Sequence, residues 1–155
     1  MATSGLLVMA RGLEMERTLS IAFQQRQVEK RYVAVVAGRP SPDEGEIALP
    51  LITDWPNRPL QKVDFDIGKP SLTRYRSLGY DAASDSTRLL LEPVTGRSHQ
   101  LRVHLAAIGH PILGDLLYAG EHRLRAPRLL LHAASLTFVH PLSQAPCRYD
   151  CPPAF

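Results

Sequence analysis

The sequence contains little cysteine, little lysine and no long hydrophobic run. Its two cysteines, Cys147 and Cys151, are too few for a disulfide framework, so we expect a reducing, cytoplasmic environment. The longest apolar run near the N-terminus, residues 6–10, is shorter than the core of a signal peptide or a membrane-spanning helix. We therefore expect no membrane association. The six histidines are scattered, and His99 and His104 do not share a helical face, so we expect no metal site.

The sequence also lacks the signatures of several enzyme classes. It has no phosphate-binding glycine loop, no dinucleotide fingerprint and no serine nucleophile elbow. We find no internal repeat or coiled coil. The length of 155 residues predicts one domain, and 45% hydrophobic with 21% charged residues exclude a disordered chain.

The basic residues are mostly arginine. Of 18 basic residues 15 are Arg, and the formal net charge is +3. Arginine makes planar, bidentate contacts with phosphates and bases, so the composition favours a nucleic-acid partner. The alternative is that a GC-rich genome enriches arginine codons without any such function.

Hydrophobic patterning predicts two helices and several strands. Residues 12–27 and 98–108 have apolar positions at helical spacing, and Gly109 ends the second helix. Residues 40–70 form a proline-rich loop, whose centre at 54–59 cannot be a regular helix or central strand. Because strands are segregated rather than alternating with helices, we expect an α+β domain with a mixed, largely antiparallel sheet and flanking helices. Residues 3–10 are expected to be a loop that leads into a buried strand. Further strands are expected at 30–37, 62–66, 71–78, 87–92, 129–131 and 135–139.

The start of the second predicted helix is a candidate anion site. Thr95 or Ser98 can cap the helix, Gly96 lets the backbone turn, and the free N–H groups then face the same direction as Arg97. An amphipathic helix with solvated Arg and His side chains would have the same spacing, so both interpretations stay open.

Two further places have functional and structural interpretations. Tyr32 lies in an apolar strand and is either a core aromatic or a functional one. Trp55, Arg58 and Lys62 in the proline-rich loop form either an aromatic and cationic platform for nucleic acid or a loop anchor.

Several separated motifs, taken in order, resemble the RluA family of pseudouridine synthases. The resemblance runs from Met1 almost to Phe155, and the loop at 54–63 together with residues 127–133 is similar to the RluA subgroup. The motifs are Met-Ala-Thr-Ser-Gly-Leu at 1–6, Lys-Arg-Tyr-Val-Ala at 30–34, Thr-Gly-Arg-Ser-His-Gln-Leu-Arg-Val-His at 95–104 and Gly-His-Pro-Ile-Leu-Gly-Asp at 109–115.

The resemblance implies cofactor-free isomerisation of uridine in RNA, after the target nucleotide is flipped out of its stack. The subgroup acts on transfer RNA anticodon stem-loops and on large-subunit ribosomal RNA. The family uses an Asp that acts on the sugar, a Tyr packed against the uracil and an Arg that pairs with the Asp. By motif, Tyr32 and Arg97 match the last two, and Trp55, Arg58, Lys62, His99 and Arg102 are the expected RNA contacts.

The nucleophilic Asp has no match in this sequence. The family motif His-Arg-Leu-Asp stands just before the Thr-Ser-Gly segment, so the Asp is expected upstream of Met1, and residues 1–155 are expected to be the C-terminal portion of one monomeric catalytic domain. We therefore expect this chain to be inactive by itself. A non-catalytic RNA-binding domain is the alternative, and a plain structural or interaction module is a third possibility.

Overall fold

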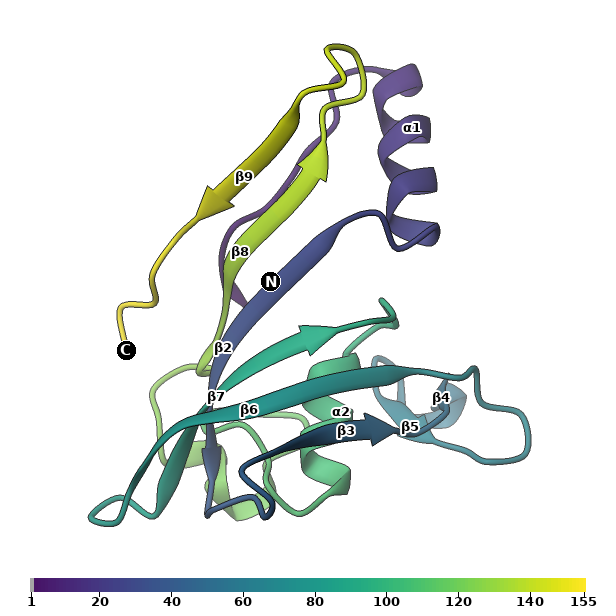
Figure 1. Cartoon of the computed structure of the whole chain (residues 1–155). Coiled ribbons are helices and arrows are strands. Elements are labelled where there is room, and N and C mark those ends of the chain that lie inside the picture. Colours follow the sequence, from purple (N-terminus) through teal and green to yellow (C-terminus); the bar gives the residue numbers. More distant parts are fainter. Residues whose placement is uncertain (1) are drawn as a thin grey trace.

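A computed structural model describes residues 2–155 of the chain (Figure 1). Met1, with which the first motif begins, lies outside the described residues. The elements follow in the order β1 (Ser4–Gly5), α1 (Leu13–Gln24), β2 (Glu29–Ala37), β3 (Glu44–Ala48), β4 (Leu51–Thr53), the 3-10 helix η1 (Trp55–Asn57), β5 (Gln61–Val63), β6 (Leu72–Asp81), β7 (Ser86–Pro93), α2 (Gln100–Ala107), the 3-10 helix η2 (Gly120–Leu124), β8 (Leu131–Val139) and β9 (Pro146–Asp150).

A seven-stranded mixed sheet organises the fold. Its order is β1-β8-β2-β7-β6-β3, and β9 also pairs with β8. Only β1 pairs in parallel, while all other neighbours in this sheet are antiparallel. β4 and β5 form a separate antiparallel hairpin. The expected α+β class with a largely antiparallel sheet is confirmed.

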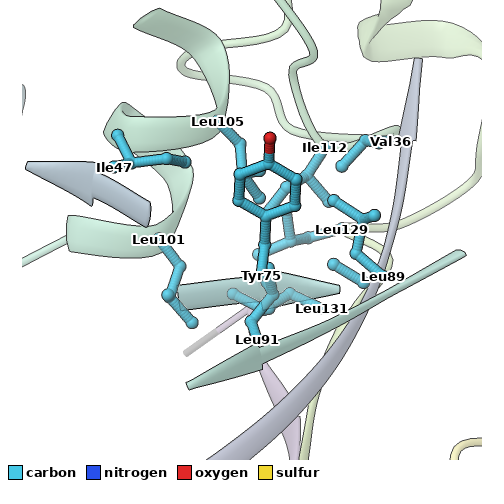
Figure 2. Close-up of a cluster of buried hydrophobic side chains, with 11 residues drawn as sticks. Val36, Ile47, Tyr75, Leu89, Leu91, Leu101, Leu105, Ile112, Leu129 and Leu131 are labelled. Carbon is cyan, nitrogen blue, oxygen red and sulfur yellow. The ribbon is translucent and has the colours of Figure 1, made fainter. Parts of the chain in front are cut away.

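The main core lies between the sheet and α2. Tyr75 of β6 stands in its centre, surrounded by leucines from β7, α2 and β8 (Figure 2). Leu89, Leu91 and Leu105 are fully buried, and Ile112 closes the cluster from the segment after α2. Two of these residues, Leu101 and Leu105, come from α2, so the start of that helix is fixed by the core.

A second, smaller cluster holds α1. The strands β2 and β8 extend beyond the main core, and α1 packs beside their far ends (Figure 1). Its buried members are Leu19, Val28 and Phe138. Leu13, at the start of α1, is 85% exposed, whereas Ala22 and Phe23 near its end are partly buried against this cluster.

The first predicted strand was wrong. Only Ser4–Gly5 pairs with β8, while Leu7 and Met9 are 64% and 79% exposed. β9 pairs with β8 from Ser135 to Val139 and so occupies the edge that residues 6–10 would need. These apolar residues therefore have no strand partner.

The proline-rich segment contains more structure than predicted. The interpretation of residues 54–59 is confirmed, since they contain only a 3-10 turn. Two of its short strands, β3 and β4, were not predicted, while β5 overlaps the strand expected at 62–66: β3 pairs with β6, and β4 pairs with β5. Each has five residues or fewer, which is too short for a visible alternation of apolar and polar positions.

At the C-terminal end, the two strands predicted at 129–131 and 135–139 are one continuous strand, β8, and β9 was not predicted. β8 carries a bulge: Arg31 pairs with Ser135 and Tyr32 with Ala133, so Ala134 is the extra residue. The predicted helices and the strands at 30–37, 71–78 and 87–92 are confirmed within a few residues.

Candidate active site and RNA interface

A cavity of about 490 Å³ lies where the sheet meets the start of α2. Its size falls within the range of small-molecule sites. Five parts of the chain contribute to it: the N-terminal segment, the end of α1, β2, the turn after β7 together with the start of α2, and β8. The lining residues are Ala2, Thr3, Phe23, Lys30, Tyr32, Pro93, Thr95, Gly96, Arg97, His99, Gln100, Leu101, Arg102 and Leu131.

Tyr32 reaches this cavity from the middle of the sheet. It is half-buried, packs against the main core and stands opposite the β8 bulge at Ala134. Bulges beside a functional residue commonly re-aim its side chain. Burial raises the pKa of the Tyr32 phenol, so the hydroxyl stays protonated at neutral pH. Tyr32 therefore belongs both to the core and to the cavity wall, and the two interpretations of the sequence are not exclusive.

Lys30 is a cavity residue that the sequence analysis missed as a candidate. It precedes Tyr32 by two positions in β2, and residues two apart point to the same face of a strand. Its ammonium lies 5.4 Å from the centre of the Phe23 ring. Burial lowers the pKa of Lys30. The period-two spacing from Tyr32 was the signal that could have identified it.

The turn before α2 is capped differently from the prediction. Neither Thr95 nor Ser98 caps the helix; instead the buried Gln100 side chain accepts a hydrogen bond from the Arg97 N–H at 3.0 Å. Thr95 donates its hydroxyl to the same Gln100 oxygen at 2.7 Å. Gln100 can bridge the turn in this way because its longer side chain also donates to Leu72 O and Thr73 Oγ1.

His99 adopts a strained backbone at the first residue before α2. Its φ of 52° and ψ of 16° lie in the left-handed region. A residue with a Cβ atom pays about 1–2 kcal/mol for this conformation. Such strain persists only where the surroundings enforce it, and it concentrates at functional sites.

The two arginines of this motif have different environments. Arg102 is 13% exposed and makes a bidentate ion pair with buried Asp115, at 2.6 and 2.7 Å. Arg97 is exposed, and none of the ion pairs found within residues 2–155 involves it. The Arg97 guanidinium is therefore available to a ligand or another carboxylate, whereas Arg102 already has a partner.

The β4–β5 hairpin carries the predicted aromatic and cationic residues. Trp55 is 64% exposed, and the Arg58 guanidinium lies over its ring at 4.3 Å. The Nζ atom of Lys62 is 3.6 Å from Asp64 Oδ2. The hairpin is tied to the cavity through Tyr118, whose hydroxyl oxygen accepts the Gln61 N–H at 2.9 Å and is 2.7 Å from His99 Nδ1.

Other site types receive no support from the described part of the chain. Residues 2–155 contain no group of three or more His, Cys, Asp or Glu arranged to hold a metal ion. None of the helices in this range is long and apolar enough to cross a membrane. His104, which the motif placed near the site, is fully buried among Leu49, Ser71 and Thr73 and has a structural environment.

Comparison with known proteins gives concordant results. Residues 1–107 match the sequence model of the family described as RNA pseudouridylate synthase. The chain is 57% identical over 142 residues to the dual-specificity RNA pseudouridine synthase RluA of Escherichia coli K12, and 48% identical over 156 residues to the protein of that name from Pasteurella multocida. These matches span 91% and 100% of this chain, but 64% and 71% of the two relatives.

Solved structures agree with the sequence comparison. Human RNA Pseudouridylate Synthase Domain Containing 1 superposes with a TM-score of 0.78 at 28% identity, over 93% of this chain and 62% of the human one. Human RNA Pseudouridylate Synthase Domain Containing 4 gives 0.71 at 25% identity, over 91% and 64% of the two chains. Shared fold, motif order and sequence identity over most of the length lead to one assignment: the chain belongs to the RNA pseudouridylate synthase family.

Proposed function

We propose that residues 1–155 are the C-terminal portion of a catalytic domain that isomerises uridine to pseudouridine in RNA. One observation carries this proposal: within a chain of this family, Tyr32 and the unpaired Arg97 line the same cavity. The reaction breaks the glycosidic N–C bond, turns the uracil and joins it to the ribose through carbon. Transfer RNA anticodon stem-loops and large-subunit ribosomal RNA are the substrates that the resemblance to the RluA subgroup implies.

Tyr32 is proposed to pack against the flipped uracil and to assist removal of the proton at C5. Its half-buried position supports a role in which the ring contacts the base. Because burial keeps the phenol protonated, the hydroxyl assists by passing on its own proton as it takes up the one from C5. A flipped base needs an apolar surface to replace its lost stacking, and the Tyr32 ring offers one.

Arg97 is proposed to pair with the carboxylate that acts on the sugar. Its exposed guanidinium has the fork geometry for a bidentate contact that keeps a carboxylate ionised. None of the described residues that line the cavity is acidic. In the proposal this carboxylate is the Asp of the family motif, which precedes the Thr-Ser-Gly segment.

Trp55, Arg58, Lys62, His99 and Arg102 are proposed to face the RNA. The exposed Trp55 ring can stack on a base, and Arg58 adds charge beside it. Arg102 would act mainly by shaping this surface, because Asp115 already accepts two hydrogen bonds from its guanidinium. Binding through phosphates should weaken steeply as salt rises.

The test is complementation of the missing part. A chimera joins the N-terminal portion of the Escherichia coli relative to this chain, and RNA from a strain without that relative is the substrate. Pseudouridine is mapped by chemical adduct and primer extension. We expect the chimera to form pseudouridine, and the chain alone to form none.

Substitutions in the chimera test the residue roles. Arg97→Lys should reduce turnover far more than RNA binding, because lysine keeps the charge but loses the fork. Tyr32→Phe should bind RNA and turn over slowly. Arg76→Lys is the matched control, since Arg76 is also exposed and lies outside the cavity. A chimera that binds RNA without forming pseudouridine would instead favour the non-catalytic RNA-binding alternative.

A further inference from the structure

Tyr118 contacts three parts of the site: the Arg102–Asp115 ion pair, His99 and the β4–β5 hairpin. It was not among the residues expected from the sequence. Its backbone N–H donates to Asp115 Oδ1 at 3.2 Å, and the Arg102 guanidinium lies over its ring at 4.9 Å. The Tyr118 ring meets the His99 ring edge to face, with 5.6 Å between centroids. The buried Arg102–Asp115 ion pair thus holds Tyr118, and Tyr118 contacts a residue that lines the cavity.

The hydrogen bonds of the Tyr118 hydroxyl determine the tautomer of His99. A backbone amide can only donate, so the Gln61 N–H uses a lone pair of the Tyr118 oxygen. The phenol proton then needs an acceptor, and His99 Nδ1 lies 2.7 Å away. If Nδ1 carried the proton instead, the phenol proton would have no acceptor among these contacts. His99 is therefore assigned as the tautomer with hydrogen on Nε2.

Burial, together with the neighbouring Arg102 cation, keeps the His99 ring neutral. Burial lowers the pKa of His99 most, and the Arg102 cation lowers it further, while Asp115 acts in the opposite direction. Burial also raises the pKa of Tyr118, so its phenol keeps its proton. A neutral ring whose Nδ1 is occupied by Tyr118 has one remaining polar group, the Nε2–H.

The backbone of His99 supports a functional reason for this arrangement. Its left-handed conformation is maintained although it is unfavourable for a residue with a side chain. The His99 carbonyl accepts the first helical hydrogen bond, from the Val103 N–H at 3.0 Å. His99 thus stands at the start of α2, contacts Tyr118 and lines the cavity.

We propose that Tyr118 is a positioning residue of this site: it holds His99 so that Nε2–H donates to an oxygen of the bound nucleotide, and the same hydroxyl ties the Trp55 hairpin to the cavity wall. This proposal rests on the proposed function, because it assigns an RNA nucleotide to the cavity. The acceptor is an oxygen of either the uracil or the backbone phosphate.

The first measurement needs no RNA. Long-range proton–nitrogen correlation spectra of the full 155-residue chain report which His99 nitrogen carries hydrogen. We expect the Nε2–H tautomer at pH 7 and titration below the ordinary histidine range. In Tyr118→Phe, His99 should become a mixture of tautomers and titrate closer to that range. Tyr80→Phe is the matched control, because Tyr80 also donates its hydroxyl to one partner, Asp85, but on the exposed surface.

The second measurement adds a uridine-containing RNA stem-loop. We expect the His99 Nε2–H resonance to shift on binding, and Tyr118→Phe to weaken affinity about three- to tenfold, the loss of one or two ordinary hydrogen bonds. The part of the Tyr118→Phe effect that acts through His99 should disappear in a His99→Ala background, so the losses of the two variants should be less than additive. Uridine and inorganic phosphate, added separately, distinguish the two sources of the acceptor oxygen by which one shifts the resonance.

Each contrary outcome has one meaning. An Nδ1–H or charged His99 at pH 7, an unchanged tautomer in Tyr118→Phe, or additive losses in the double variant would overturn this proposal while RNA binding stays intact. If the wild-type chain and the chimera bind no RNA, the proposed function fails, and the donor role of His99 fails with it.

Discussion

The two α-helices described within residues 2–155 pack in separate clusters against one sheet and are buried to very different degrees. α2 buries five of its eight residues, including the polar Gln100 and His104, whereas α1 buries only Leu19 among twelve. Every polar atom buried in the described side chains has a hydrogen-bond partner. The difference in burial indicates that the α2 end, which supplies most of the residues that line the cavity, is the more rigid one, while α1 contributes Phe23 to the cavity.

The Arg102–Asp115 ion pair is the sharpest test of that rigidity. Asp115→Asn should destabilise the fold by about 3–5 kcal/mol, because it leaves the largely buried Arg102 cation without its counterion. Chemical denaturation of the full chain gives the free energy of unfolding. Asp150→Asn is the matched control, since its ion pair with Arg148 is exposed, and it should change stability little. A similar loss of stability in Asp115→Asn and Asp150→Asn would contradict the expected difference between the buried and the exposed ion pair.

The same substitution in each helix measures the difference between the two ends directly. Leu105→Ala removes a fully buried side chain from the main core and should cost about 3–5 kcal/mol. Leu19→Ala removes the one buried residue of α1, which packs in a cluster of three, and should cost roughly 2 kcal/mol, because a small cluster can relax around the gap. Equal costs would mean that α1 belongs to the core as much as α2 does.

The elements that sequence predicted well are those with a long, regular pattern. α2 and the strands β2, β6 and β7 each span eight or more residues, enough for their apolar spacing to be read. The short strands β3, β4 and β9 could not be predicted in this way, whereas β5 overlaps the strand predicted at 62–66. β3 and β9 form because β6 and β8 offer them an edge, which is a property of the assembled sheet, whereas β4 pairs with β5 in a separate hairpin.

The candidate site was predictable as far as its motifs extend. Tyr32, Arg97 and His99 line one cavity, as their common motif set suggested, although their roles remain predictions. The bonds of the Gln100 amide to Leu72 and Thr73 and the contact between Tyr118 and Gln61 join residues far apart in sequence. No local pattern encodes such contacts, because they depend on how the hairpin packs against α2.

Acid should weaken the α2 end selectively. His104 is fully buried, and burial lowers its pKa; the same direction holds for His99. Below the ordinary histidine pKa of about 6.5 the unfolded chain takes up protons that the folded chain resists, so stability falls as pH decreases through this range. Above it both states hold neutral rings and the effect vanishes.

The measurement compares denaturation at pH 8 and pH 5.5 in wild type and in His104→Gln. The variant should lose stability at pH 8, because glutamine cannot reproduce every contact to Ser71, Thr73 and Leu49. Its free energy of unfolding should also fall less between pH 8 and pH 5.5, by roughly 1 kcal/mol less than in wild type. The reason is that the variant has one fewer buried histidine that resists protonation. An unchanged drop would assign the acid sensitivity to other groups.

The smallest effect is expected on the outer face of α1. Leu13 and Ile21 are 85% and 43% exposed, so replacing Leu13 by serine removes little buried surface and replacing Ile21 removes more. Leu13→Ser should alter the free energy of unfolding by about 0.5 kcal/mol or less, and Ile21→Ser by about 1 kcal/mol. Leu101 of α2 is only 7% exposed, so Leu101→Ser serves as the comparison and should reduce the free energy of unfolding several times more. A large loss at Leu13 or Ile21 would mean that this face is covered in solution, and the two ends of the molecule would then be more alike than their burial indicates.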